Sequence, residues 1–416
     1  MESYPPLWQD LKITNSMPAA ALTAWLKRAE HSGYNLRSAT ITSHDYNDKC
    51  RNHIMRIKRR SKLERLELRI PSGSASIPAM LPDPSQYLKT LVVTSGSWVL
   101  ISLVKQIMAD YTHLEHVEFH GVPERDSPSS WPEMPNLQSI VLRALSVHSN
   151  MIAGSHGLVL AWVSLSSPTC QRKISHEQND LIKASPNMKS AKIKNWTNEA
   201  VPGIVDMAGW TKLTHLDISG TQFTCLPVFP STLVHLEAEG ARLSLADDSE
   251  LDQKKDFFHL PKLEYLGVIN SGFFDVVNDL ANLALASGSL KELYVGDNGP
   301  ITTNSRNSWL KSLPAPSSSL TTLSLHEEVE LPENIIIALL RQYPNLQDVI
   351  LSYTSATGST LRELFERKNK PAYVDMEGCE GCYYDAVEAA RKVGIEVAHQ
   401  LAPKKKVNKG GRHPGT

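Results

Sequence analysis

The sequence predicts an α/β solenoid, in which parallel strands line a concave face and helices cover the convex face. Two observations predict this fold class. A short cassette with apolar residues at relative positions 1, 4 and 6 recurs along the 416 residues. Many copies are followed by a stretch in which apolar residues recur every three or four positions, as on a helix. Because no single strand-and-helix unit can bury its apolar side, such units must stack into one continuous core.

The cassette is clearest at Leu63, Leu66 and Leu68. Its copies begin roughly 20 to 30 residues apart, the spacing typical of leucine-rich repeats. The good copies start at Leu63, Leu88, Leu114, Leu137, Met188, Leu213, Leu233, Leu263, Leu290, Leu320 and Leu346. A weaker copy at Leu36 opens the series, and another near Val374 closes it. We therefore predict a leucine-rich-repeat solenoid, or horseshoe, with about twelve parallel strands over residues 36–376.

Positions 4 and 6 of each cassette should face the core, because alternate residues of a strand share one face. The residues expected to be fully buried are Leu66, Leu68, Leu216, Ile218, Leu323 and Leu325. Helical periodicity predicts convex helices over 98–107, 276–284 and 336–340. Residues 1–35 are expected to cap the array, with a helix from Pro18 to Ala29 whose N-cap is Ser16. The array itself is expected to span residues 36–398.

One interval is about twice as long as the others, from Leu137 to Met188. Leu160, Val163 and Leu165 within it fit the cassette, which indicates a divergent repeat. The polar stretch 164–180 indicates instead an irregular insertion, which would place the irregular segment near 150–187. Both interpretations agree with the sequence.

Composition limits the classes of function. The formal net charge is −1, so neither nucleic acid nor a membrane is an expected partner. The five cysteines are too few and too irregular for a disulfide scaffold. We find no nucleotide-binding loop, hydrolase motif or metalloprotease motif, so we expect no enzyme and no cofactor. Cys379 is expected to pack in the core, and no metal site is expected, since spacing gives His116 and His120 no acidic partner.

Binding by the concave face is the remaining function. Positions 3, 5 and 7 of each cassette should point onto that face, where a protein or peptide partner would bind. Neighbouring repeats there carry acidic and aromatic residues, a combination that suits a basic or aromatic peptide. The predicted binding residues are His215, Asp217, His235, Glu237, Glu239, Tyr265, Glu292 and Tyr294.

Two end segments resemble F-box/leucine-rich-repeat proteins of the fungal type. Pro6-Leu7-Trp8-Gln9-Asp10-Leu11 is similar to the segment that follows an F-box, and residues 374–395 are similar to the last repeat of that family. The resemblance implies the substrate-recognition part of an SCF-type ubiquitin ligase. An F-box needs about 40 residues, so binding to the cullin adaptor is expected only if an F-box lies upstream. The alternative is a ubiquitin-independent scaffold for nuclear assembly or small-GTPase regulation.

The C-terminal residues 399–416 form a basic tail that we expect to be disordered. Residues 403–416 contain five basic residues and no acidic one. We refer to 403–416 as the C-terminal basic segment. Lys404, Lys405 and Lys406 resemble a monopartite nuclear import signal. We therefore expect the nucleus, in preference to the cytoplasm, as the location of the protein.

Overall fold

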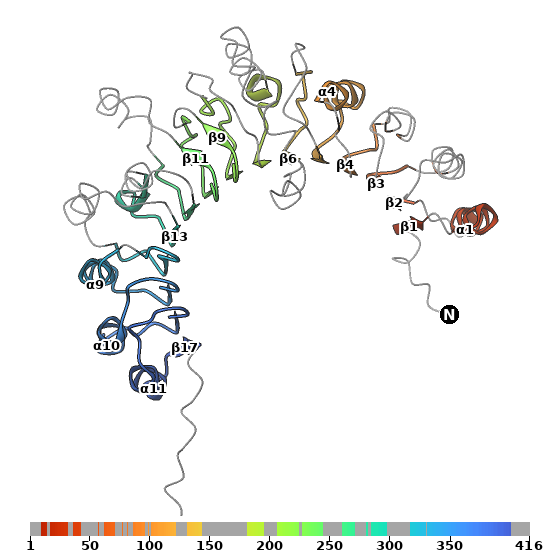
Figure 1. Cartoon of the computed structure of the whole chain (residues 1–416). Coiled ribbons are helices and arrows are strands. Elements are labelled where there is room, and N and C mark those ends of the chain that lie inside the picture. Colours follow the sequence, from red (N-terminus) through yellow and green to blue (C-terminus); the bar gives the residue numbers. More distant parts are fainter. Residues whose placement is uncertain are drawn as a thin grey trace, which may run out of the picture.

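The computed structural model shows one long arc of repeats (Figure 1). It describes residues 10–14, 17–31, 36–42, 57, 62–70, 77, 81, 86–95, 99, 101–121, 131–143, 181–194, 206–223, 227–243, 260–270, 280–281, 284–297, 317–329 and 331–400. The core is continuous along the arc, because buried apolar residues from all these ranges belong to one cluster.

The inner layer of the arc is a 15-stranded sheet in which every pair of neighbouring strands is parallel. Its strands follow the chain order: β1 (Asp10–Thr14), β2 (Ser38–Thr42), β3 (Arg65–Ile70), β4 (Thr90–Ser95), β5 (His116–His120), β6 (Ser139–Arg143), β7 (Ser190–Lys194), β8 (His215–Asp217), β10 (His235–Glu237), β12 (Tyr265–Ile269), β13 (Glu292–Gly296), β14 (Thr322–Ser324), β15 (Asp348–Ile350), β16 (Tyr373–Asp375) and β17 (Glu396–Ala398). The α/β solenoid of the leucine-rich-repeat type is therefore confirmed.

The cassettes pair position by position. Leu66 of β3 lies opposite Leu91 of β4, and Leu216 of β8 lies opposite Leu236 of β10. This register places positions 4 and 6 of every repeat in one apolar layer. The six residues predicted to be fully buried all have exposed fractions of 2% or less.

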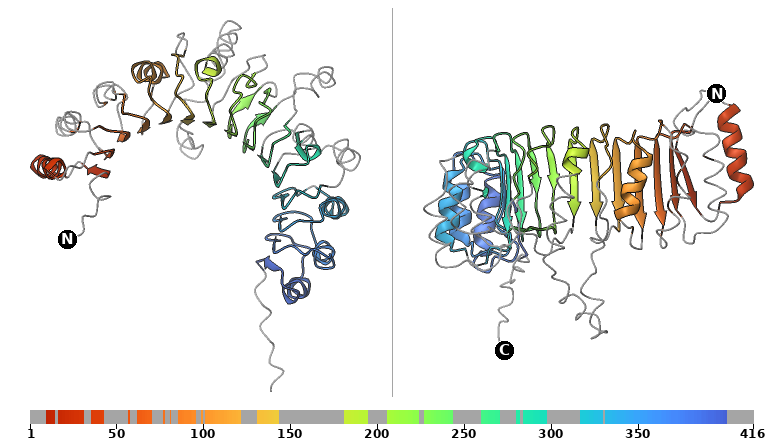
Figure 2. Two further views of the ribbon diagram at one scale, coloured as in Figure 1. Left: turned by 180° about the vertical axis from the view of Figure 1, so that it is seen from behind. Right: turned by 90° about the horizontal axis from the view of Figure 1, so that it is seen from above.

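The outer layer carries the helices that the structure describes (Figure 2). They are α1 (Ala19–His31), α4 (Ile101–Asp110), α9 (Glu333–Gln342), α10 (Gly358–Phe365) and α11 (Tyr384–Lys392). Between β8 and β12 the outer layer is instead a two-stranded parallel sheet of β9 (Gln222–Phe223) and β11 (Arg242–Leu243). None of the helices in the described ranges is long and apolar enough to cross a bilayer.

The predicted helices at 18–29, 98–107 and 336–340 correspond to α1, α4 and α9, with shifted bounds. Leu280 and Ala284 of the segment 276–284 are buried, and most of that segment lies outside the described residues. The predicted N-cap Ser16 and the C-terminal basic segment also lie outside them.

The sheet is longer than predicted at both ends. β1 precedes the N-terminal helix and pairs with β2, so Asp10–Thr14 forms a strand of the array in front of residue 36. β17 pairs with β16 and extends the sheet beyond residue 376. Leu11 and Ile13 are both buried, as positions 4 and 6 of a cassette should be.

The strands on either side of the long interval are neighbours in the sheet. β6 and β7 are hydrogen-bonded to each other from Ser139↔Ser190 to Arg143↔Lys194. The cassette at 160–165, and with it the choice between a divergent repeat and an insertion, lies outside the described residues.

Candidate functional site

The concave face is built from rows of side chains that run across the strands. Positions 3, 5 and 7 of successive cassettes face each other in the parallel register, as His215, His235 and Tyr265 do for position 3. Neighbouring strands are about 4.8 Å apart, so side chains in one row can touch. The predicted residues from β8 to β13 therefore form one surface.

An aromatic ladder crosses the middle of this surface. The rings of His215 and His235 stack with centroids 5.7 Å apart, and those of His235 and Tyr265 stack at 3.9 Å. Tyr294 continues the ladder, with its ring 5.3 Å from that of Tyr265. Burial lowers the pKa of His235, and the neighbouring His215 acts in the same direction. The ladder thus presents a row of flat, partly covered rings to the concave side.

Glu237 fills a notch beside the ladder, next to Gly267. Its Oε2 accepts a hydrogen bond from the Tyr265 hydroxyl at 2.5 Å. Burial raises the pKa of Glu237, and the neighbouring Asp217 and Glu239 carboxylates add to the rise, while the Tyr265 hydrogen bond opposes it. Burial and this same hydrogen bond raise the pKa of Tyr265. Glu237 and Tyr265 thus form a partly buried, hydrogen-bonded carboxylate–phenol pair.

Asp217 lies opposite Glu237 in the register, as predicted, but its carboxylate already has partners in the chain. Its exposed fraction is only 7%. The carboxylate accepts hydrogen bonds from the backbone N–H and hydroxyl of Ser219, and it pairs with Lys194 at 2.7 Å. Burial opposes its ionisation, but these hydrogen bonds outweigh burial and lower the pKa of Asp217. Asp217 therefore positions its neighbours and offers a partner little free surface.

The other predicted residues are more accessible. Glu239 is exposed two residues after the end of β10, and His215 is exposed at the start of the ladder. Glu292 is half-buried and accepts a hydrogen bond from the Tyr294 hydroxyl at 3.3 Å. Glu239, Glu292 and the two tyrosines are the groups best placed to meet a ligand.

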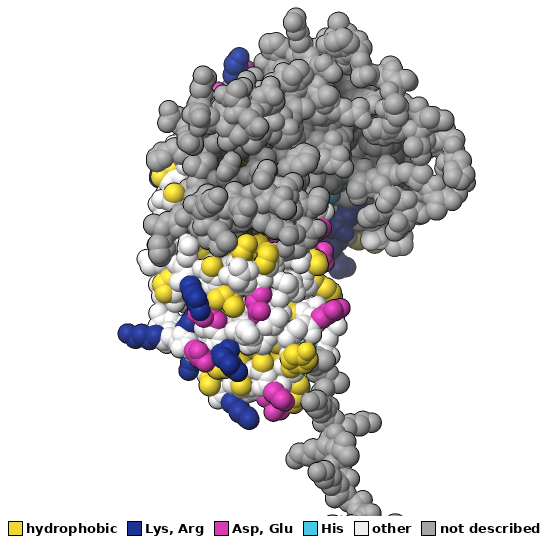
Figure 3. All heavy atoms as spheres, turned by 60° about the vertical axis from the view of Figure 1, so that its left-hand side comes forward, with side chains coloured by type: hydrophobic (Ala, Val, Ile, Leu, Met, Phe, Trp, Pro, Cys, Tyr) yellow, Lys and Arg dark blue, Asp and Glu magenta, His cyan; other side chains and the backbone are white. Residues whose placement is uncertain are grey.

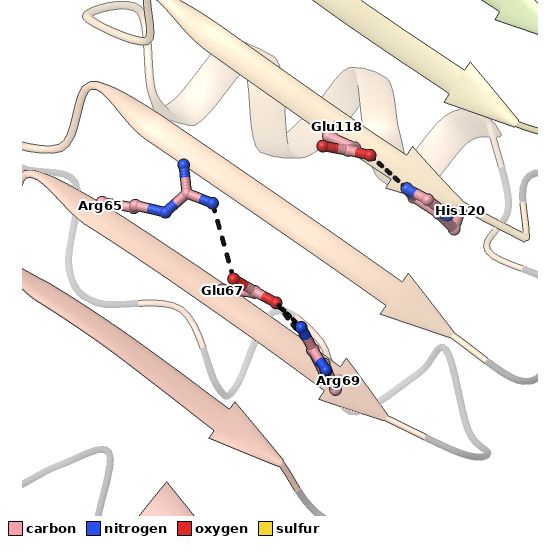
Figure 4. Close-up of polar contacts among 5 residues, drawn as sticks. All are labelled: Arg65, Glu67, Arg69, Glu118 and His120. Carbon is pink, nitrogen blue, oxygen red and sulfur yellow. Dashed lines mark hydrogen bonds and ion pairs between the residues drawn. The ribbon is translucent and has the colours of Figure 1, made fainter. Parts of the chain in front are cut away.

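The N-terminal half of the concave face has a different chemistry (Figure 4). Glu67 lies between two guanidinium groups, with Arg69 at 2.7 Å and Arg65 at 3.6 Å. His120 lies 2.5 Å from Glu118. The expectation that no acidic partner is fixed for the histidines is therefore wrong for His120, because Glu118 lies two residues before it on the same strand face.

Charge is segregated along the concave face. Positions 3, 5 and 7 of β1 to β7 carry the basic residues Lys12, Arg65, Arg69, Arg143, Lys192 and Lys194 and the acidic residues Asp10, Glu67 and Glu118. From β8 to β17 the same positions carry Asp217, Glu237, Glu239, Glu292, Asp348, Asp375, Glu377 and Glu396, and no Lys or Arg. We call the region from β8 to β17 the acidic half.

The outer side of the C-terminal repeats is mixed instead. Figure 3 shows Lys or Arg and Asp or Glu side chains interspersed over the described part of that surface. Some of them pair there, as Arg341 of α9 does with Glu363 of α10 at 2.7 Å. The segregation of charge therefore belongs to the concave face rather than to the composition of these repeats.

Two contributors to the site were not among the predicted residues. Lys194 partners Asp217 across adjacent strands, and Gly267 leaves the space that the Glu237 carboxylate fills. The register of the cassettes was a signal for Gly267, which faces Glu237 directly. It places Lys192, rather than Lys194, opposite Asp217.

The described residues offer no cluster of three His, Cys, Asp or Glu side chains that could hold a metal ion. Cys379 and Cys382 are buried free thiols, and Cys379 donates a hydrogen bond to the Leu351 carbonyl at 3.0 Å. Burial raises the pKa of the Cys382 thiol to about 11. Both side chains thus pack as core groups, as predicted for Cys379.

Comparison with known proteins identifies no family for the chain. No protein-family model matches the sequence, and no curated protein matches it either. A solved structure of a protein from Bacteroides fragilis covers 93% of this chain and 73% of its own length, with 10% identity and a TM-score of 0.18. A likeness at that TM-score carries no argument. The chain is therefore described by its own geometry, as an all-parallel repeat solenoid.

Proposed function

We propose that the chain is a protein-binding scaffold whose concave face holds a segment of a partner protein. The aromatic ladder of His215, His235, Tyr265 and Tyr294 carries this proposal. Aromatic side chains that are held rigid and partly covered lose little entropy when they are buried, and they dominate the energy of many interfaces. A regular array of strands holds them in place, as a binding site requires.

The partner segment is proposed to be basic and to carry an aromatic or apolar anchor. Glu239 and Glu292 flank the ladder and supply negative charge at accessible positions. Charged groups steer association, whereas the rings would determine how long the complex lasts. The two kinds of side chain should thus have separable kinetic effects.

The test begins with affinity capture of a partner by the full chain, followed by kinetics with the captured partner. Charge reversal by Glu239→Lys and Glu292→Lys should slow association and flatten its salt dependence. Tyr294→Ala should mainly speed dissociation. The matched control is charge reversal at Glu366 and Asp385, which are exposed in the convex helices. If the control abolishes binding and the concave variants do not, the concave face is not the binding surface.

The role in a ubiquitin ligase is a second part of the proposal. The end segments that resemble F-box/leucine-rich-repeat proteins support it, since in that family the repeats hold the substrate and the F-box holds the cullin adaptor. Translating the genomic sequence upstream of Met1 should reveal an F-box in frame, and the longer chain should capture the adaptor. Capture of a partner without the adaptor, from a gene lacking an F-box, would instead indicate a ubiquitin-independent scaffold.

A further inference from the structure

The described chain ends on the concave side of the acidic half. Gln400 lies two residues after the end of β17, and its side-chain amide donates a hydrogen bond to Glu377, which lies two residues after the end of β16. Residues 401–416 therefore start beside the last carboxylates of the acidic half. These residues include the C-terminal basic segment, with Lys404, Lys405, Lys406, Lys409 and Arg412 and no acidic residue.

The surface at this point has the opposite charge. Asp348, Asp375 and Glu396 lie in the last three strands of the sheet, and Glu377 lies just after β16. None of the four forms an ion pair with a described Lys or Arg. Burial is the largest cause of the raised pKa of Tyr373, and the negative charges of these four carboxylates raise it further. The C-terminal end of the concave face is thus an unneutralised acidic surface.

The convex side of the same terminal repeat offers a basic segment no comparable acidic surface. The last turn of α11 carries Arg391 and Lys392. The segment therefore leaves the array between a basic helix end and an acidic sheet face. Electrostatics favours the sheet face.

The length of the chain allows the contact. An extended residue spans at most about 3.5 Å, so Lys404 lies within about 14 Å of Gln400 and Lys406 within about 21 Å. Strands are about 4.8 Å apart, so these lysines can extend over β16, β15 and β14 and, for Lys406, to β13. Attachment to the same chain also gives the segment an effective concentration on the order of millimolar, so even a weak interaction would be substantially populated.

We propose that the C-terminal basic segment binds the acidic half of the concave face of its own chain, over β15 to β17. The occupant is this segment rather than a second copy of the chain or a membrane. It would lie beside the surface, from β8 to β13, that the proposed function assigns to a basic partner, and its positive charge would weaken the attraction of that partner. The segment's binding itself does not depend on the proposed function.

Carbodiimide cross-linking of the full chain tests the proposal, because it joins amines to carboxylates that touch. Mass spectrometry should find Lys404, Lys405 or Lys406 linked to Asp348, Asp375 or Glu377. The yield should fall by roughly tenfold between 0.05 M and 1 M salt, because salt at 1 M screens exposed charges beyond about 3 Å. The internal positive control is the pair of Lys291 and Glu264, which are 2.8 Å apart.

Variants and isotopic labelling make the test specific. The triple variant Asp348→Asn, Asp375→Asn and Glu377→Gln should lose the links to those three positions without new links elsewhere in the array. The matched variant Glu366→Gln and Asp385→Asn, on the convex helices, should leave the yield unchanged. A mixture of isotopically light and heavy chains should give links within one chain.

Three results would overturn the proposal. One is linkage of the lysines to convex and concave carboxylates with equal yield. Another is the absence of tail links in samples in which Lys291 and Glu264 are linked. The last is linkage only between light and heavy chains, which would identify a second copy as the occupant.

Discussion

Gly267 is expected to determine where the Glu237 carboxylate lies. A Cβ atom added at Gly267 would be 2.9 Å from Glu237 Cδ, which is closer than such atoms approach each other. The φ angle of Gly267 is not in the left-handed region, so its backbone tolerates alanine. The substitution Gly267→Ala should therefore act through the side chain of Glu237, which must leave the notch and lose its hydrogen bond with Tyr265.

The magnitude follows from two opposing effects. A hydrogen bond to a charged group contributes about 1.5–3 kcal/mol, and the half-buried setting of this one suggests about 1–2 kcal/mol. Replacing glycine by alanine at a compatible position stabilises a protein by about 0.4–1 kcal/mol, because the unfolded chain loses freedom. We therefore expect Gly267→Ala to lower the free energy of unfolding by about 0.5–1 kcal/mol.

A double-mutant cycle measured by urea unfolding separates the two effects. In the Tyr265→Phe background the hydrogen bond is already lost, so adding Gly267→Ala should stabilise the protein by about 0.4–1 kcal/mol. The coupling between the two positions should thus be about 1–2 kcal/mol. Equal destabilisation by Gly267→Ala in both backgrounds would refute the reasoning, since the added methyl group would then disturb something other than this hydrogen bond.

Three further expectations concern the core, the pH dependence and the location. Leu216 is 0% exposed, so Leu216→Ala should lower the free energy of unfolding by about 2–5 kcal/mol through the cavity it leaves, as measured in urea. The folded-state pKa of His235 lies below 6.5, so the unfolded state binds the proton more readily and stability should fall as pH drops through 6.5; a ring signal in NMR that titrates at or above 6.5 would contradict this. If residues 404–406 act as an import signal, changing all three to alanine should lower the nuclear fraction of a fluorescent fusion, and an unaltered distribution would reject that role.

The repeat architecture was predictable because the cassette encodes the register. The pattern of Leu63, Leu66 and Leu68 recurs with few changes of residue type, and each copy determines which side of its strand is buried. β1 was missed although Trp8, Leu11 and Ile13 have the spacing of the cassette, because the copy stands alone in front of a helix. β17 was missed because its strand is short and its cassette has Gly394 at position 1.

The candidate site was predictable only as a set of positions. The sequence placed Asp217 and Glu237 side by side, and their register agrees. The sequence did not show that the Asp217 carboxylate pairs with Lys194 and accepts a hydrogen bond from Ser219, nor that Glu237 accepts one from Tyr265. Those contacts depend on side-chain conformations. Two carboxylates at equivalent positions of adjacent repeats thus differ in pKa direction.

The pairing of β9 with β11 affects the local curvature of the arc. Packed helices lie about 8–10 Å apart, whereas strands lie about 4.8 Å apart, so an outer layer of helices forces the strands of the inner layer to fan. Where β9 and β11 form the outer layer, its spacing equals that of the inner layer, so the outer layer does not force the inner strands to fan. We expect the array to curve less here than where helices form the outer layer. This flatter part would widen the span between the basic and acidic regions of the concave face.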